Sequence, residues 1–149
     1  MFMKKIAVLL FWCCALLQAG ATDRGWLTSV PQALEKAKKE NKMVLLDFTG
    51  SDWCGWCMKF RKEALDTQEF ATYAAKNLVL VEVDFPRRTP QAADLKQANK
   101  ALAAEYHVES YPTFVVLSKD GKELGRQKGY REGGPQPFIA RLEKLKNNN

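Results

Sequence analysis

Two cysteines three positions apart follow an apolar run and a tight turn, and this arrangement limits the possible folds more than any other feature. The run MVLLDF (residues 43–48) is rich in strand formers, and Gly50 favours a turn before Cys54 and Cys57. Beyond Cys54, apolar residues recur at helical spacing. We therefore expect a buried strand, a turn and a helix with both cysteines in its first turn. The other side of this helix carries three basic residues that we expect to face solvent: Lys59, Arg61 and Lys62.

The N-terminus is typical of a secretory signal peptide. Two lysines precede the apolar run IAVLLFWCCALL, and the small residues AGA end at position 21. We expect residues 1–21 to be removed and residues 22–149 to form a single domain. The run is shorter than the about 20 residues of a transmembrane helix, and an uncleaved membrane anchor is the alternative.

Removal of this segment would leave two of the four cysteines, Cys54 and Cys57, outside the cytoplasm, where disulfides persist. The formal net charge is +6, but the basic residues alternate with acids along helical stretches. That pattern is typical of solvated helix faces, so we expect no nucleic-acid binding.

Metal and haem sites do not fit the cysteine pair. A structural zinc site needs four ligands, and the single histidine, His107, is far away in the sequence. A c-type haem needs a histidine directly after the second cysteine, where this chain has Met58. An iron–sulfur cluster lacks thiolates, and the loop between the cysteines is too short to brace a whole domain. We expect no metal and no bound cofactor.

Thiol–disulfide exchange fits the pair better than an inert local disulfide does. At a helix N-terminus the free N–H groups and the helix dipole favour a thiolate, so we expect Cys54 to be exposed and to have a lowered pKa. Cys57 lies one turn later on the apolar side, where we expect it to be more shielded. Cys54 would attack a substrate, and Cys57 would resolve the mixed disulfide.

The remaining segments alternate helix and strand, and then end in a hairpin and a helix. This order predicts an α/β fold with a mixed central sheet flanked by helices. The expected helices are 31–41, 68–77, 91–106 and 137–146, and the expected strands are 78–85, 113–118 and 123–130.

Two segments resemble the thioredoxin superfamily: DFTGSDWCGWC (residues 47–57) and YHVESYPTFVVLSKDGKELGRQKGY (residues 106–130). Within it, the chain is most similar to secreted bacterial thioredoxin-like proteins, including the C-terminal domain of the membrane reductant conductor DsbD. The resemblance implies a three-layer thioredoxin-like sandwich and a periplasmic thiol:disulfide oxidoreductase that acts as a monomer on protein thiols and disulfides.

The same resemblance implies roles for residues around the pair. Pro112 would be a cis proline facing the disulfide, and the backbone of Tyr111 would receive an extended substrate segment. Trp53 would shield Cys54. Trp56 would either contact substrate or face solvent as structural filler.

Asp47 corresponds to the buried acid that exchanges a proton with the resolving cysteine in this superfamily. Burial at the end of an apolar strand should raise its pKa. One extra residue separates the acid from the first cysteine, so Asp52 is a rival for this role. The lysine that thioredoxin pairs with its acid is replaced by Leu80, with Glu82 nearby.

The direction of electron flow is open in the sequence, because the dipeptide Gly55-Trp56 between the cysteines does not fix a reduction potential. The resemblance favours a reductant that is supplied by a membrane electron donor of the DsbD type. The alternatives are a disulfide oxidase or isomerase, and a thioredoxin-like binding or chaperone module that hardly cycles.

Overall fold

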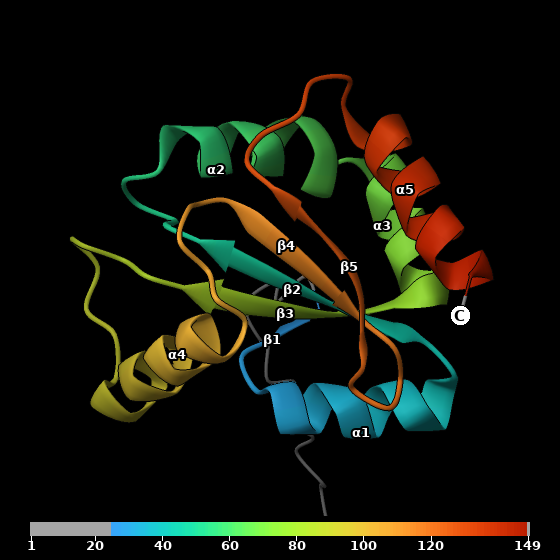
Figure 1. Ribbon diagram of the computed structural model, residues 1–149. Helices are drawn as coiled ribbons and strands as arrows, with labels where there is room; N and C mark the ends of the chain where they lie inside the picture. The colour runs from blue at the N-terminus through green and yellow to red at the C-terminus, as the bar shows by residue number, and fades with distance from the viewer. Residues whose placement is uncertain (1–24, 149) are drawn as a thin grey trace, which may run out of the picture.

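The computed structural model describes residues 25–148 and contains one five-stranded sheet with helices on both faces (Figure 1). The expected signal peptide, residues 1–21, lies outside the described residues. Within residues 25–148, no helix is long and apolar enough to cross a membrane. The elements are β1 (Trp26–Leu27), α1 (Val30–Glu40), β2 (Met43–Thr49), α2 (Gly55–Phe60), the π-helical turn η1 (Arg61–Leu65), α3 (Gln68–Asn77), β3 (Leu78–Asp84), α4 (Ala93–Glu105), β4 (Thr113–Leu117), β5 (Glu123–Lys128) and α5 (Pro135–Asn147).

The sheet is mixed, and its strand order is β1-β3-β2-β4-β5. β1 and β2 run parallel to β3, whereas β4 is antiparallel to β2 and β5 is antiparallel to β4. β2 is therefore the central strand, and the cysteine segment follows its C-terminal end. The predicted α/β architecture, with a parallel half and a hairpin half, is confirmed.

Two apolar cores lie on opposite faces of this sheet, because successive side chains of a strand point to opposite faces. Leu45 faces α2, α3 and α5, and packs with Phe60 and Phe138. Val44 and Leu46 face α1 and α4 on the other side. Asp47 shares the face of Leu45 by the same alternation, so the strand period directs this acid toward the cysteine-bearing helix.

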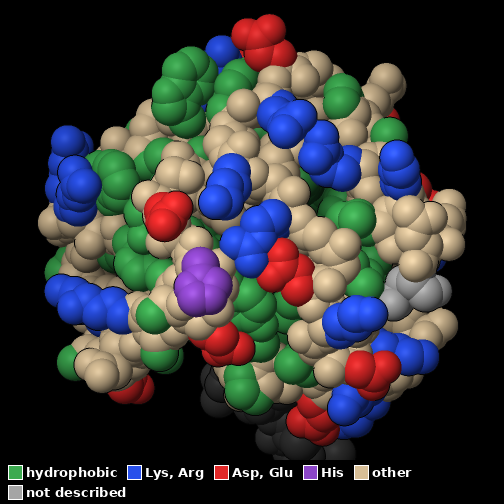
Figure 2. Space-filling model, viewed as in Figure 1, with side chains coloured by type: hydrophobic (Ala, Val, Ile, Leu, Met, Phe, Trp, Pro, Cys, Tyr) green, Lys and Arg blue, Asp and Glu red, His purple; other side chains and the backbone are tan. Residues whose placement is uncertain are grey.

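The basic residues are distributed over the surface. On the face shown in Figure 2, Lys and Arg side chains are interspersed with Asp and Glu and do not gather in one block.

Two parts of the fold differ from the sequence-based expectation. β1 was not predicted, because two residues carry no detectable period. The helix after the cysteines changes at Arg61 into a π-helical turn, whose wider spacing redirects the side chains that follow. Arg61 itself lies one regular turn after Cys57, with its N–H bonded to Cys57 O, and so on the same side of the helix as Cys57. Only 26% of its side chain is exposed, and the expectation that it faces solvent is wrong.

Candidate active site

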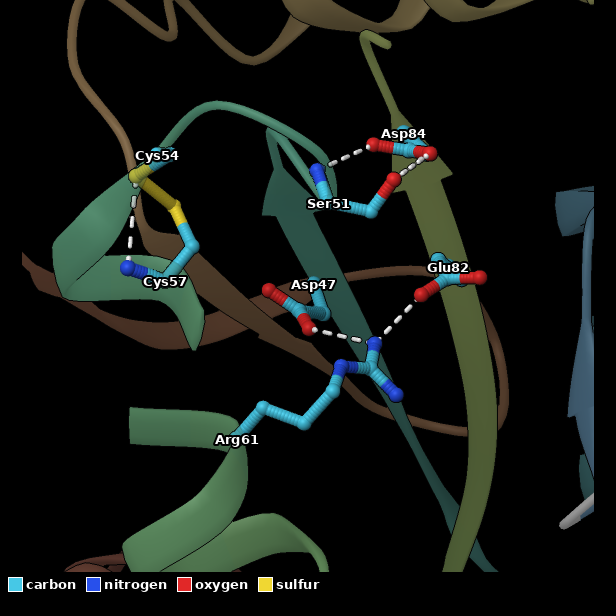
Figure 3. Close-up of polar contacts among 7 residues, drawn as sticks. All are labelled: Asp47, Ser51, Cys54, Cys57, Arg61, Glu82 and Asp84. Carbon is cyan, nitrogen blue, oxygen red and sulfur yellow. Dashed lines mark hydrogen bonds and ion pairs between the residues drawn. A yellow bond between two sulfur atoms is a disulfide. The ribbon is translucent and has the colours of Figure 1, made fainter. Parts of the chain in front are cut away.

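Cys54 and Cys57 form a disulfide at the start of α2, with Cα atoms 5.2 Å apart. Cys54 is the N-cap of this helix, and its Sγ accepts a hydrogen bond from the backbone N–H of Cys57 at 3.2 Å (Figure 3). An anion at Cys54 Sγ would be stabilised by this donor and by the positive end of the helix.

The expected exposure of Cys54 is wrong. Only 6% of Cys54 is exposed, against 4% of Cys57, so both cysteines are buried in the oxidised protein. The reason is the capping geometry. The Cys54 side chain turns back over the first turn of α2, where its sulfur is bonded to Cys57 Sγ and accepts the Cys57 N–H.

The turn before the cysteines depends on a glycine. The backbone N–H of Cys54 donates to Gly50 O at 2.9 Å, and the indole of Trp53 lies against Gly50. A β-carbon on Gly50 would be 2.4 Å from Trp53 Cε2, far inside a permitted contact. The indole Nε1–H of Trp53 donates to Phe85 O at 2.7 Å, so the ring joins this turn to the segment after β3.

Two further side chains fasten the turn to β3 and the loop that follows it. The Ser51 N–H and Oγ–H donate to the two carboxylate oxygens of Asp84, at 2.9 and 2.5 Å (Figure 3). Asp52 accepts the backbone N–H groups of Arg87, Arg88 and Thr89, at 2.9, 2.8 and 2.7 Å. The extra residue of this turn is thereby accommodated without removing Asp47 from the sheet face that it shares with Leu45.

Asp52 and Asp47 have opposite electrostatic environments. Backbone hydrogen bonds, that of Arg87 above all, hold the pKa of Asp52 well below its usual range, so Asp52 stays ionised at neutral pH. Burial raises the pKa of Asp47 to about 7, with Arg61 opposing the shift and Glu82 and Asp84 adding to it. Of the two acids, Asp47 is the one that changes protonation near neutral pH.

Asp47 lies between the disulfide and Arg61 (Figure 3). Its Oδ2 is 3.4 Å from Arg61 Nη2, and the same nitrogen forms a close ion pair with Glu82. Within residues 25–148, Asp47 Oδ1 has no hydrogen-bond partner. A buried carboxylate oxygen without a donor favours the protonated acid, which agrees with the raised pKa.

The Tyr111–Pro112 peptide bond is cis, in the loop that leads into β4. Pro112 O accepts the Gly129 N–H at 2.8 Å, which ties this loop to the end of β5. The ring of Tyr111 meets Trp53 edge-on, with centroids 5.9 Å apart, and packs on Phe85. Trp53 therefore links the cysteine turn to the proline loop.

Comparison with known proteins identifies this arrangement. A family model described as a thioredoxin-like domain matches residues 30–146. The chain belongs to the thioredoxin-like family. The fold expectation and the superfamily resemblance are thus confirmed.

Two curated relatives of this thioredoxin-like domain come from Chlamydia pneumoniae. The disulfide bond reductase DsbH is 38% identical over 115 residues, which are 77% of this chain and 69% of DsbH. The thioredoxin-related protein DsbJ is 36% identical over 101 residues, 68% of this chain but only 29% of DsbJ.

Solved structures of similar proteins superpose on this chain and have the same fold. A structure of DsbH oxidoreductase superposes with a TM-score of 0.75 at 38% identity, covering 80% of this chain and 82% of that one. The reduced C-terminal domain of Neisseria meningitidis DsbD gives a TM-score of 0.59 at 25% identity, covering 77% of this chain and 92% of that one. With its cysteine pair, this thioredoxin-like protein is a thiol:disulfide oxidoreductase.

The other tryptophan of the motif lies on the surface of the thioredoxin-like domain. Trp56 is 58% exposed and stacks on Tyr130, with ring centroids 5.2 Å apart and an interplanar angle of 27°. Lys59 Nζ lies over both rings, and the Tyr130 hydroxyl donates to Glu63. Trp56, Tyr130 and Lys59 form an aromatic platform beside the disulfide.

Sequence reasoning missed Arg61 and Tyr130. Arg61 lies four positions after Cys57, which would have placed it on the same side of a regular helix. It was assigned to solvent because it stands among other basic residues. Nothing near Tyr130 in the sequence indicates that it lies beside Trp56, because the segment after β5 meets α2 only in the folded protein.

Proposed function

We propose that this protein reduces disulfides in other proteins outside the cytoplasm. The observation that carries the proposal is the position of Cys54 Sγ at the start of α2, where it accepts the Cys57 N–H, with the buried Asp47 nearby. The similarity to the disulfide bond reductase DsbH supports the reducing direction.

The reduced protein would begin with the Cys54 thiolate. It attacks one sulfur of a substrate disulfide, forms a mixed disulfide and releases the first substrate thiolate. The Cys57 thiol then gives its proton to the Asp47 carboxylate, and the Cys57 thiolate attacks Cys54 Sγ. This step closes the Cys54–Cys57 disulfide and releases the second substrate thiolate, so that two electrons pass to the substrate.

The surroundings of the disulfide suit an extended polypeptide. The backbone at Tyr111, before cis Pro112, offers hydrogen-bonding groups to a substrate strand. Trp53 packs against Tyr111 on the side of the proline loop. On the other side of the disulfide, the exposed ring of Trp56 supplies an apolar contact.

Turnover needs a donor of electrons outside the cytoplasm. We propose a periplasmic location after removal of residues 1–21, a monomeric state, and a membrane donor of the DsbD type that reduces the Cys54–Cys57 disulfide again. No cofactor is required, because the electrons travel between cysteine pairs.

The test is the reduction potential of the pair in residues 22–149, measured by equilibration with dithiothreitol or glutathione buffers and by thiol alkylation. A value near the about −270 mV of thioredoxin supports a reductant. A value near the about −120 mV of DsbA overturns the proposed direction and indicates a disulfide donor.

The Cys54→Ser, Cys57→Ser variant should lose all activity on a disulfide-linked protein. If it still protects an unfolded client from aggregation as well as the parent does, the protein is a binding module.

A further inference from the structure

One guanidinium is shared between two carboxylates on neighbouring strands. Asp47 of β2 and Glu82 of β3 are register partners in the parallel pair, so their side chains leave the sheet on the same face. Arg61 Nη2 forms an ion pair with each of them (Figure 3). The contact with Glu82 is the closer one.

The position of Arg61 is set by three other features. Arg61 follows Cys57 by one regular helical turn, with its N–H bonded to Cys57 O, so its side chain lies on the same side of the helix as Cys57. The guanidinium carbon lies 5.2 Å from the ring centroid of Trp26 in β1, so the group stacks on an aromatic face. Glu82 then binds the guanidinium from the side away from the disulfide (Figure 3).

We propose that Arg61 is a positioning residue for the thiol–disulfide reaction, and that Glu82, by holding its guanidinium, sets how readily Asp47 takes the proton of Cys57. This inference rests on the proposed function, in which Asp47 is the proton acceptor. It assigns to Arg61 and Glu82 a role in the closing step that does not require contact with the substrate.

The charged and titratable groups around Asp47 determine in which direction each substitution should move its pKa. Arg61 of η1 is the cation, Glu82 and Asp84 of β3 are the acids, and the Cys57 thiol of α2 is the proton donor in the reduced protein. On β4 the register partner of Asp47 is Phe114, which carries no charge. Removing the cation favours protonated Asp47, and removing Glu82 favours the carboxylate.

Two substitutions should therefore move the titration of Asp47 in opposite directions. Arg61→Met keeps an apolar stem against Trp26 and should raise the midpoint by about one pH unit or more, since two carboxylates then lie side by side without their shared cation. Glu82→Gln should lower it by about one pH unit, because Arg61 is then free to pair with Asp47 alone. Arg61→Lys should lie between the parent and Arg61→Met.

The measurement is the pH titration of the Asp47 side-chain carboxyl carbon by NMR in the parent and in each variant. The second readout is the pH dependence of the closing step. Reduced protein is mixed with 5,5′-dithiobis(2-nitrobenzoate), and release of the second thionitrobenzoate anion reports attack by Cys57.

The matched controls are Lys62→Gln, which removes an exposed cation next to Arg61, and Glu69→Gln, which removes an exposed acid on α3. Neither control should move the midpoint.

The outcomes separate the two proposals. Opposite shifts for Arg61→Met and Glu82→Gln, with unmoved controls, support the inference. If Asp47→Asn removes the pH dependence of closing but Arg61→Met and Glu82→Gln leave the midpoint in place, the inference is overturned and the role of Asp47 stands. If Asp47→Asn leaves the pH dependence intact, the proposed proton acceptor itself is wrong. Near-parental amide spectra of Arg61→Lys and Glu82→Gln keep the test valid where Arg61→Met does not fold.

Discussion

The indole of Trp53 occupies the space where a β-carbon on Gly50 would lie, 2.4 Å from its Cε2 atom. The close approach lets Trp53 reach Phe85 O and pack against Tyr111 at the same time. One small residue thus lets the cysteine turn, the segment after β3 and the proline loop meet at a single ring.

Replacement of Gly50 by alanine should displace this ring. We expect Gly50→Ala to lower the free energy of unfolding by about 1–3 kcal/mol, because the added methyl overpacks the site and the Trp53 hydrogen bond is lost. Chemical denaturation measures the loss, and near-ultraviolet circular dichroism reports the ring. Gly55→Ala is the matched control, since a β-carbon there meets nothing within 4 Å. An equal loss in both variants would contradict the steric explanation.

Asp52 should hold the loop of residues 86–90 closed. It accepts three backbone N–H groups of that loop, so Asp52→Ala removes the anchor of all three. We expect trypsin to cleave after Arg87 or Arg88 faster in this variant, as followed by mass spectrometry under native conditions. Because the pKa of Asp52 is lowered, Asp52 is ionised throughout the near-neutral range in which trypsin acts, and the parent should keep its protection there. Glu109→Gln, an exposed acid elsewhere, should leave cleavage unchanged.

Asp47 should make the stability of the oxidised protein fall as pH rises. Its pKa is raised to about 7 in the folded protein, against 3.8 for an ordinary aspartate. Between these values the folded state holds a proton that the unfolded state has lost, so unfolding becomes easier with increasing pH and the effect is complete above pH 7. Asp47→Asn should remove this dependence. We expect it to be more stable than the parent by on the order of 4 kcal/mol at pH 8, and about equal to it near pH 4.

Urea denaturation at several pH values measures this difference, with Asp94→Asn, an exposed acid on α4, as the control. A constant difference between parent and Asp47→Asn across this range would show that Asp47 is ionised throughout. The same variant should close its disulfide more slowly, so gain of stability and loss of activity are expected together.

Trp56 should matter for protein substrates and hardly for stability. Because the ring is largely exposed, Trp56→Ala should change the free energy of unfolding by about 0.5 kcal/mol or less. It should raise KM for a disulfide-linked protein about fivefold, a loss of roughly 1 kcal/mol of aromatic contact, and leave reduction of a small disulfide unchanged. Met58→Ala is the matched control, since Met58 is also on α2 and is 47% exposed. An equal rise in KM for Met58→Ala would contradict a specific role for the aromatic platform.

Much of the fold was predictable because its signals are local. The apolar run through Leu45 and the helical spacing after Cys54 are properties of neighbouring residues, and they gave the strand, the turn and the helix in the right order. The raised pKa of Asp47 also follows from a local pattern, an acid at the end of a buried strand.

The rest of the site depends on contacts between distant parts of the chain. Arg61 reaches Glu82, 21 positions away, because β3 lies beside β2 in the folded sheet, and no local pattern indicates that pairing. Asp52 finds its partners 35 to 37 positions away, in backbone N–H groups that every sequence has. The exposure of Cys54 was mispredicted because a capping side chain turns back over its own helix.

The direction of β1 decides how this protein can be immobilised. β1 runs parallel to β2, whose C-terminal end leads to Cys54, so the N-terminal end of β1 faces away from the cysteine turn. A resin, label or surface joined at Gly25 would therefore leave the disulfide accessible to a large partner. The same linkage through residues 86–90, beside Trp53, would block it.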